Sequence, residues 1–235
     1  MKVFLSGYGR MGKLIESLAL EKGWEIVGRG DIDCPQAYDT APKADLCIDF
    51  SGPGALLKLA DYIRRTGTPL VSGTTGFTEP DFKVLRELGE KTQVVWASNY
   101  STGVAVLRKI LRDYGPVLKD WDKEIVEMHH NQKADAPSGT AKTLLEELDP
   151  DGKATVVHGR EGMCGKRKPE EIGVFSLRGG TLAGEHTVYF FGEDETLTLT
   201  HSASSRRIFA AGAIRAAEAL LQKPAGFYTL EDLIF

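Results

Sequence analysis

The strongest constraint on the fold is a glycine-rich hexapeptide near the start of the chain. Its residues are Gly7, Tyr8, Gly9, Arg10, Met11 and Gly12, which fit the pattern G-x-G-x-x-G. The hexapeptide follows the apolar run at residues 3–5 and opens a segment whose apolar residues recur at helical spacing up to Leu18. A glycine-rich turn between a strand and a helix lets the backbone approach a pyrophosphate and points the helix N-terminus at it. These residues therefore predict a dinucleotide site.

An acidic residue stands where such a site needs one. Residues 25–27 have the character of a second strand, and Asp31 follows it, with Asp33 as a second candidate. A carboxylate at this place accepts hydrogen bonds from the ribose hydroxyls and repels a 2′-phosphate. Ile32 stands where a cation would favour that phosphate, and the direction of the nearby Arg29 is not set by the sequence. The pattern favours NADH, with NADPH possible.

Strand-like and helix-like segments alternate through the first half of the chain. Further strands are expected at residues 46–50, 69–72 and 94–97, with helices at 55–65 and around 82–88. The strands are short and apolar, which is typical of strands buried on both faces of a parallel sheet. The alternation predicts an α/β fold with a doubly wound parallel sheet of the Rossmann type.

The pattern changes after Asn99. A helix is expected at residues 104–114 and another at 138–148, and strands at 123–128, 154–158, 172–178, 185–191 and 195–201. Gly192-Glu193-Asp194 is typical of a hairpin turn. We expect a second, α+β domain built on a mixed open sheet, spanning residues 100–205. Residues 1–99 and 206–235, which include a final helix at 208–221, would form the dinucleotide-binding domain.

Composition excludes several classes of protein. A formal net charge of −4 and a pI near 5.8 argue against a nucleic-acid-binding protein, which normally has a basic face. No stretch approaches the roughly 20 apolar residues of a membrane span. The three cysteines form no C-x-x-C pair, and their odd number suits a reducing compartment. A cytoplasmic protein without membrane partners is expected.

The densest polar cluster lies at residues 127–140 and contains His129, His130 and Lys133. Such side chains serve as general acids, as anion contacts or as metal ligands. Neighbouring residues of a strand point to opposite faces and no third ligand follows at helical spacing, so no metal site is predicted. The helix start after Pro137 offers free N–H groups to an anion. Capping by Asp135 or Ser138 is the structural alternative, and the two can coexist.

This cluster resembles the signature of a known family. Residues 127–141 match E-x-H-H-x-x-K-x-D-A-P-S-G-T-A, a pattern of the 4-hydroxy-tetrahydrodipicolinate reductase family. Residues 73–77, 97–101, 159–162, 184–187 and 204–206 also look like motifs of that family. The resemblance implies NAD(P)H-dependent reduction of a cyclic dicarboxylate in the diaminopimelate route to lysine.

The resemblance also implies roles for individual residues. His129 would be the proton donor or acceptor, and Lys133 the second proton donor or charge partner. The substrate carboxylates would be held by His130, Lys133, Gly139, Thr140 and Arg206. The nicotinamide side of the cofactor would be lined by Gly73, Thr74, Thr75, Ala97, Ser98, Asn99 and Tyr100. Members of the family are usually homotetramers formed through the sheet of the second domain.

Three other functions compete with this one. A related imine or amine dehydrogenase acting on a diamino acid would keep the glycine-rich loop but need not keep the cluster at residues 127–140. A semialdehyde-type aldehyde dehydrogenase is disfavoured, because no cysteine stands at a strand-to-helix junction as a nucleophile. A regulatory protein that only senses the cofactor would need neither a proton donor nor carboxylate contacts.

Overall fold

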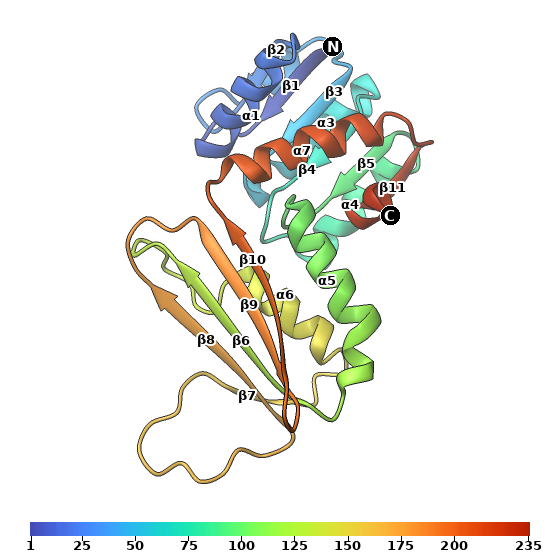
Figure 1. Ribbon diagram of the computed structural model, residues 1–235. Helices are drawn as coiled ribbons and strands as arrows, with labels where there is room; N and C mark the ends of the chain where they lie inside the picture. The colour runs from blue at the N-terminus through green and yellow to red at the C-terminus, as the bar shows by residue number, and fades with distance from the viewer. The chain divides into compact units, whose positions relative to one another are not determined.

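The computed structural model describes residues 1–235 and divides into two compact units. Unit 1 comprises Met1–Thr102 and Arg207–Phe235, and unit 2 comprises Gly103–Arg206. The chain leaves unit 1 once and returns to it once (Figure 1). The expected domain boundaries, at residues 99/100 and 205/206, lie within a few residues of these divisions.

Unit 1 is built on a six-stranded sheet with the order β11-β5-β4-β3-β1-β2. Its strands are β1 (Lys2–Ser6), β2 (Glu25–Gly30), β3 (Leu46–Asp49), β4 (Leu70–Ser72), β5 (Gln93–Trp96) and β11 (Gly226–Thr229). Every pairing is parallel. All residues of β3 and β4 are buried, as in a sheet that is covered on both faces. The Rossmann-type fold expected from the sequence is confirmed.

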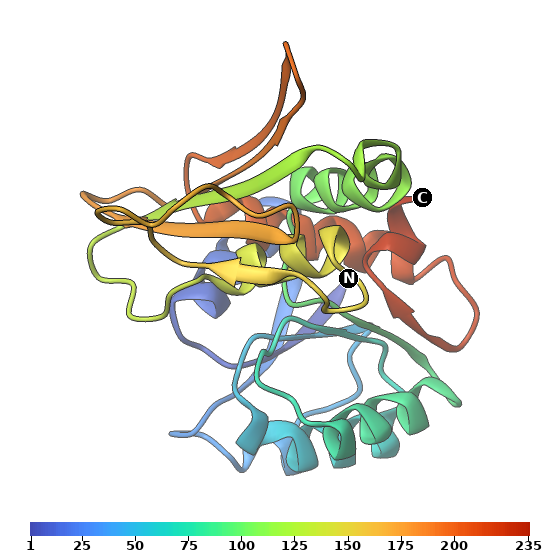
Figure 2. The same cartoon turned by 90° about the horizontal axis from the view of Figure 1, so that it is seen from below.

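Helices cover both faces of this sheet. The elements are α1 (Arg10–Glu21), α2 (Ala37–Thr40), η1 (Pro53–Ala55), α3 (Leu56–Thr66), α4 (Glu79–Gly89), α7 (Arg207–Leu220) and α8 (Glu231–Ile234). Helices α1 and α7 contact each other on one face, whereas α2, α3 and α4 lie together on the opposite face (Figure 2). The last long helix, α7, belongs to unit 1, as the sequence led us to expect.

Unit 2 contains a five-stranded sheet with the order β10-β9-β6-β8-β7. Its strands are β6 (Asp122–His129), β7 (Thr155–Val157), β8 (Glu171–Arg178), β9 (Gly184–Phe191) and β10 (Thr196–Ala203). Strand β8 runs parallel to β6 and β7, whereas β9 runs antiparallel to β6 and β10. The mixed sheet expected from the sequence is confirmed.

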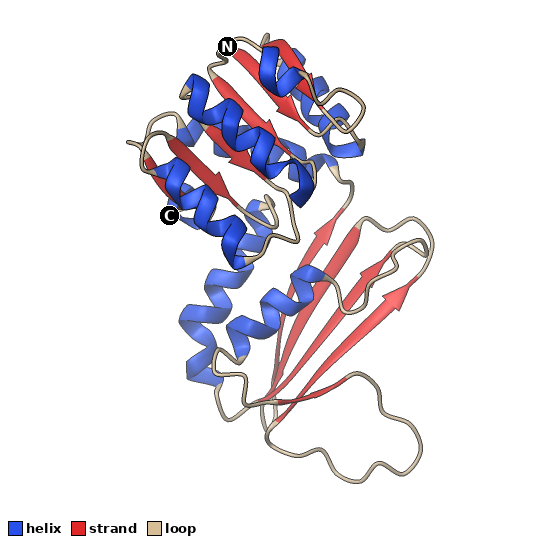
Figure 3. Cartoon of the chain, turned by 180° about the vertical axis from the view of Figure 1, so that it is seen from behind, coloured by secondary structure: helices blue, strands red, loops and turns tan.

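The helices of unit 2 pack on one face of its sheet (Figure 3). They are α5 (Thr102–Tyr114) and α6 (Gly139–Leu148), and a 3-10 turn, η2 (Gly115–Leu118), follows α5. Leu111 of α5 and Leu144 of α6 meet Ile125 and Phe190 of the sheet in a buried core. This core fixes the carboxyl end of β6 beside the start of α6, where the polar cluster lies.

The opposite face of the unit 2 sheet carries apolar side chains near its surface. Leu177 is 47% exposed and Phe191 is 40% exposed. The ring of Tyr189 stacks on that of Phe191, with centroids 5.8 Å apart. The alternation of side chains along a strand places these residues away from the helices. Unit 2 thus presents an apolar sheet surface that its own helices leave uncovered.

None of the helices combines the length and the apolar character that crossing a membrane requires.

Candidate functional site

Two glycines of the glycine-rich loop in unit 1 have no room for a side chain, whereas the third is surrounded by open space. Gly7 adopts φ +86°, and a Cβ there would lie 2.5 Å from the carbonyl oxygen of Phe50. A Cβ on Gly12 would lie 2.1 Å from the carbonyl oxygen of Gly7. Around Gly9, in contrast, a Cβ would meet no atom within 4 Å. The loop therefore packs tightly at Gly7 and Gly12 and leaves the backbone of Gly9 accessible to a ligand.

Helix α1 begins directly after Gly9, and no side chain caps its N-terminus. Arg10, Met11 and Gly12 form its first turn. The N–H groups of a first turn lack intrahelical partners and carry the positive end of the helix dipole. This helix start is therefore suited to hold a pyrophosphate.

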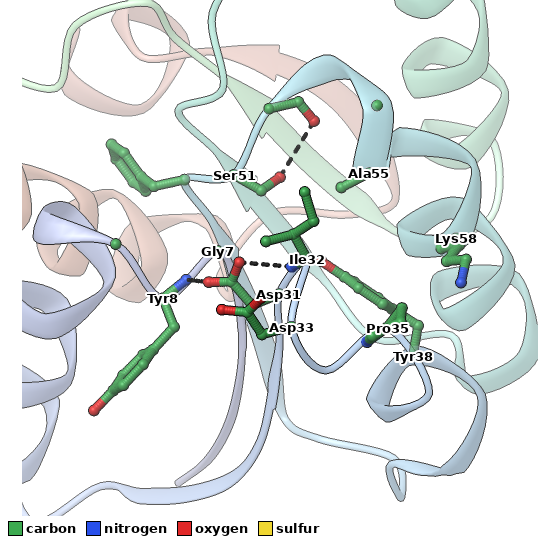
Figure 4. A pocket seen from close by; sticks show the side chains of 14 residues that line it. Gly7, Tyr8, Asp31, Ile32, Asp33, Pro35, Tyr38, Ser51, Ala55 and Lys58 are labelled. Carbon is green, nitrogen blue, oxygen red and sulfur yellow. Dashed lines mark hydrogen bonds between the residues drawn. The ribbon is translucent and has the colours of Figure 1, made fainter.

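A cavity of about 760 Å³ lies beside the loop (Figure 4). It is lined by Gly7, Tyr8, Gly9, Asp31, Ile32, Asp33, Pro35, Tyr38, Phe50, Ser51, Gly52, Gly54, Ala55 and Lys58. The Asp31 carboxylate accepts hydrogen bonds from the backbone N–H groups of Tyr8 and Ile32. These bonds hold Asp31 at the edge of the cavity, where the sequence predicts a ribose contact. The cavity fits the adenosine part of a dinucleotide.

Arg29 binds Glu16 of α1 and lines a neighbouring hollow together with Asp31, Asp33 and Lys13. Its guanidinium forms an ion pair with Glu16 and lies 5.2 Å from the centre of the Tyr8 ring. The Tyr8 hydroxyl donates to the same carboxylate. Burial alone would raise the pKa of Glu16, but the hydrogen bonds from Arg29 and Tyr8 outweigh it and lower that pKa. The one cation close to Asp31 in sequence is thus already neutralised.

A buried carboxylate that sequence reasoning missed, Asp49, lies at the end of β3 and is only 1% exposed. It accepts hydrogen bonds from the hydroxyls of Ser6 (2.7 Å), Ser51 (2.6 Å), Ser72 (2.8 Å) and Thr74 (2.8 Å). The donors come from the carboxyl ends of three neighbouring strands and the loops that follow them. Asp49 therefore ties together the loops that carry the predicted cofactor residues. An acidic residue at the end of an apolar run was the available signal.

The residues predicted for the nicotinamide side follow β4 and β5. Thr74 is buried against Asp49, and the buried hydroxyl of Tyr100 donates to the carbonyl oxygen of Ser72 at 2.8 Å. These two side chains support the loops. Gly73 packs against the Phe50 ring, Ala97 is buried, and Asn99 accepts a hydrogen bond from Ser101. Thr75 and Ser98 are exposed at the carboxyl end of the sheet.

In unit 2, the fully buried carboxylate of Glu127 organises the predicted catalytic cluster. It accepts hydrogen bonds from His129 Nδ1 (2.5 Å), from Arg178 (2.8 and 2.9 Å) and from the backbone N–H of Ser138 (3.1 Å). Burial would raise the pKa of Glu127, but hydrogen bonds from Arg178, Ser176 and His129 lower it to about 2. Glu127 is therefore an ionised acceptor at the centre of the cluster. Its importance is not visible in the sequence, where no role was predicted for it.

His129 ends β6 with its side chain 11% exposed. Burial lowers its pKa, while the hydrogen bond to Glu127 acts in the opposite direction. The ring of His186 meets it edge-on, with centroids 5.1 Å apart. A Cβ on Gly184 would lie 2.8 Å from His129 Nε2. The absence of a side chain at Gly184 therefore lets the His129 ring pack close to the backbone there.

His186 is 5% exposed and lies between His129 and the start of α6. Its Nε2 is 2.9 Å from the Ser138 hydroxyl, and its buried Nδ1 has no hydrogen-bond partner. Burial lowers the pKa of His186 to about 4. A charged His186 would carry an unsatisfied N–H at Nδ1, so the ring is held neutral.

The residues predicted to hold carboxylates lie in the same unit. His130 Nε2 and an Arg206 guanidinium nitrogen are 2.9 Å apart, and Lys133 pairs with Asp135 at 2.7 Å. Helix α6 begins at Gly139, where a Cβ would meet no atom within 4 Å. The residue after it, Thr140, belongs to the same first turn. The structure brings a basic pair, a lysine and a helix N-terminus into one unit.

One question left open by the sequence, which residue caps α6, has an answer here. Ser138, not Asp135, caps α6, because its hydroxyl accepts a hydrogen bond from the backbone N–H of Ala141 at 3.2 Å. No group of three or more His, Cys, Asp or Glu side chains is arranged to hold a metal ion. The predicted site residues thus form two groups, one at the sheet edge of unit 1 and one at the carboxyl end of β6 in unit 2.

Comparison with known proteins agrees with this division. The family model for the N-terminus of dihydrodipicolinate reductase matches residues 1–100, and the model for its C-terminus matches residues 103–234. A 4-hydroxy-tetrahydrodipicolinate reductase of Staphylococcus aureus (strain bovine RF122 / ET3-1) is 44% identical over 99% of this chain and 100% of its own length. The same identity and coverage hold for the reductase of strain JH9.

Solved structures share the fold. A dipicolinate-bound dihydrodipicolinate reductase from Paenisporosarcina sp. TG-14 superposes with a TM-score of 0.76 at 23% identity, over 99% of this chain and 98% of that one. A C. glutamicum DAP dehydrogenase gives a TM-score of 0.53 at 16% identity, over 99% and 93% of the two chains. The two family models and the 44% identity of the S. aureus reductase show that the chain belongs to the dihydrodipicolinate reductase family and is an oxidoreductase.

Proposed function

We propose that this chain reduces 4-hydroxy-tetrahydrodipicolinate to tetrahydrodipicolinate with NAD(P)H, in the diaminopimelate route to lysine. The observation that carries the proposal is that the chain keeps the complete family signature at residues 127–141. That signature spans the carboxyl end of β6 and the start of α6. An amine dehydrogenase acting on a diamino acid shares the architecture but has no need of this signature.

The bound nicotinamide would supply the hydride, and the protein supplies position and protons. Hydride addition to a conjugated cyclic imine leaves an enamine, whose carbon needs a proton. His129 is suited to that step because imidazole titrates near neutral pH. Lys133 is the second proton donor or charge partner, and its own carboxylate partner is Asp135.

The two substrate carboxylates would bind the cationic side of the cluster. His130 and Arg206 already lie within hydrogen-bond distance of each other, so both can turn toward one anion. The first turn of α6, with Gly139 and Thr140, offers N–H groups and a hydroxyl. Charge-assisted bonds of this kind contribute on the order of 1.5–3 kcal/mol each.

NADH is the proposed preferred cofactor. Asp31 and Asp33 line the cavity next to the glycine-rich loop, and carboxylates there favour ribose hydroxyls over a 2′-phosphate. Arg29 is bound by Glu16. NADPH is proposed as the weaker second cofactor, because Lys58 lines the same cavity.

We also propose that the chain forms homotetramers in the cytoplasm. The uncovered apolar face of the unit 2 sheet, with Leu177 and Phe191, supports self-association. Cys34, Cys47 and Cys164 are all free thiols, which suits a reducing compartment. Sedimentation equilibrium tests the assembly: the tetramer has four times the 25.7 kDa mass of one chain.

The reaction is tested by coupling the purified protein to the synthase that makes the substrate and following oxidation of NADH and NADPH separately. No oxidation of either cofactor would overturn the proposal. His129→Ala is expected to lower turnover by about 10²–10⁴ with nearly unchanged cofactor affinity, because it removes the proton donor. Equal turnover of the variant would remove His129 from the mechanism.

A further inference from the structure

The buried carboxylate of Glu127 has a partner set that points beyond a structural role. A carboxylate that is fully buried is costly unless it is paired and hydrogen-bonded. Arg178 supplies the pairing charge with two bonds, and Ser138 supplies a backbone N–H. These donors already satisfy Glu127. Its short contact of 2.5 Å with His129 Nδ1 is therefore additional to what burial of the charge needs.

That contact determines which nitrogen of His129 carries a proton. An ionised carboxylate only accepts hydrogen bonds, so the nitrogen facing it must be Nδ1–H. In the neutral ring the proton is then on Nδ1 and the lone pair is on Nε2. A proton given up by the charged ring leaves from Nε2, and the product of that step is the same neutral tautomer, still bonded to Glu127.

The surroundings of Nε2 agree with this division of roles. Gly184 has no Cβ, and one placed there would lie 2.8 Å from Nε2. His186 packs edge-on against the ring and is held neutral, so it adds no like charge beside His129. Nδ1 is thus committed to Glu127, whereas Nε2 packs beside Gly184 and has no hydrogen-bond partner within the chain.

We propose that Glu127 is a positioning residue, which fixes the orientation and tautomer of His129 so that Nε2 exchanges the proton with the substrate. The inference rests on the proposed function, in which His129 is the proton donor. Arg178 would act on His129 indirectly, since its guanidinium holds Glu127 ionised and in place. A histidine paired in this way presents one defined nitrogen to the substrate without rearrangement during the step.

The first test replaces the carboxylate by the isosteric amide, Glu127→Gln. We expect kcat to fall about 10²-fold with KM changed little, because the amide can hold the ring in either tautomer. Glu124→Gln is the matched control: Glu124 lies on the same strand and pairs with Arg160 and Arg167, but not with His129. The double variant Glu127→Gln/His129→Ala should be no slower than His129→Ala, because Glu127 acts only through His129, which is already absent.

Two measurements separate positioning from mere support of the fold. Long-range ¹H–¹⁵N spectra can resolve the chain's five histidines and should show Nδ1–H in the neutral His129 ring, lost in Glu127→Gln. The limb of the kcat/KM profile that falls as pH rises should also move about one unit lower in Glu127→Gln, because a negative charge beside the acid is removed. The remaining charged or titratable groups facing His129 are Lys133, Arg178 and His186.

The outcomes distinguish the inference from the function on which it rests. If His129→Ala loses turnover but Glu127→Gln keeps both its turnover and the Nδ1–H tautomer, Glu127 does not position His129. If His129→Ala itself keeps turnover, the proposed role of His129 fails, and the tautomer spectra still decide whether Glu127 orients the ring.

Discussion

Each unit of the molecule buries one carboxylate almost completely, but the two carboxylates have opposite kinds of partner. Asp49 in unit 1 is 1% exposed and accepts from hydroxyls and one backbone N–H, all uncharged. Glu127 in unit 2 is 0% exposed and accepts from a guanidinium and an imidazole. Both groups are well satisfied, so hydrogen-bond count alone does not separate them.

The difference shows how a buried charge can serve the fold or the chemistry. Neutral hydroxyls cannot exchange protons with Asp49 near neutral pH, so that carboxylate acts as a fixed acceptor joining three strand ends. Glu127 touches an ionisable imidazole, whose pKa burial lowers, so its charge is coupled to the protonation of His129. A buried carboxylate bonded to a histidine is therefore the stronger indication of a catalytic site.

The largest effect is expected from removing the cation beside Glu127. Arg178→Met should lower the free energy of unfolding of unit 2 by about 3–5 kcal/mol, because it leaves a buried carboxylate without its charge partner. Hydrogen exchange of the β6 amides, compared with those of β1, measures the loss in unit 2 separately. A loss below about 1 kcal/mol would mean that Ser138 and His129 satisfy Glu127 without the arginine.

The double variant Glu127→Gln/Arg178→Met sharpens this result. It removes both charges, so most of the stability lost in Arg178→Met should return. If the double variant is as unstable as the single one, the loss comes from the packing of the arginine stem and not from the unpaired carboxylate.

The second effect is a pH dependence of stability in unit 2 that originates in His186. Burial lowers its pKa from an ordinary 6.5 to about 4, so the unfolded chain binds the proton more readily than the folded one. Stability should therefore be full above about pH 6.5 and fall as the pH drops toward 4, by up to about 3 kcal/mol. Denaturant unfolding across this range measures the slope.

Glu127 extends the loss to lower pH. Its pKa is lowered from 4.5 to about 2, so its contribution is present above about pH 4.5 and disappears as the pH falls toward 2. His186→Gln should flatten the slope between pH 6.5 and 4 and leave the slope below 4.5 in place. A slope between pH 6.5 and 4 that survives in the variant would assign it to other groups.

A smaller effect is expected from Asp49 in unit 1, the buried carboxylate whose partners are all uncharged. Asp49→Asn replaces one of the two acceptor oxygens by a donor, which faces hydroxyls that must reorient. The expected cost is about 1–3 kcal/mol, read from hydrogen exchange of β1, together with weaker NADH binding. Asp45→Asn, at an exposed position just before β3, is the control and should change stability by less than about 0.5 kcal/mol. Equal effects of both variants would contradict the special role of Asp49.

The fold was largely predictable because its signals are local. The apolar runs before Gly7 and around Ile48 and the spacing in α3 each depend on residues close in sequence. Strand β11 and the short helices α2 and α8 were not predicted. Strand β11 has only four residues, Gly226–Thr229, and its pairing with β5 depends on a partner more than a hundred residues away, which no local pattern encodes.

The site was predictable where a motif carries its chemistry. The residues of the glycine-rich loop and of the signature around His129 were predicted in this way. Asp49 and Glu127 were not given roles, since their importance depends on burial and on partners such as Ser72 and Arg178 that come from other strands. Gly184 was missed for the same reason, because its close packing against the His129 ring arises only when β9 pairs with β6.

The smallest effect is expected at a third carboxylate, Glu16, whose partners are intermediate between those of Asp49 and those of Glu127. Glu16 is 8% exposed and is shared by a cation, Arg29, and a neutral donor, the Tyr8 hydroxyl. Its charge neither joins strand ends nor touches a proton donor, but pairs with the guanidinium that lines a hollow with Asp31 and Asp33. Glu16→Gln should release Arg29 and raise the ratio of kcat/KM for NADPH to that for NADH about 3–10-fold, the size of a single partly exposed charge contact.

The control for this change lies on the same helix. Glu21→Gln breaks an exposed ion pair with Arg207, neither of which lines the cavity, and should leave the cofactor ratio unchanged. If Glu16→Gln also leaves it unchanged, Asp31 and Asp33 alone reject the phosphate, and Glu16 is a structural partner as Asp49 is. If the ratio rises in Glu16→Gln and returns to its original value in Glu16→Gln/Arg29→Met, the released Arg29 guanidinium is the group that contacts NADPH. A carboxylate's part in cofactor choice would then be set by the cation that it binds rather than by its own distance from the ligand.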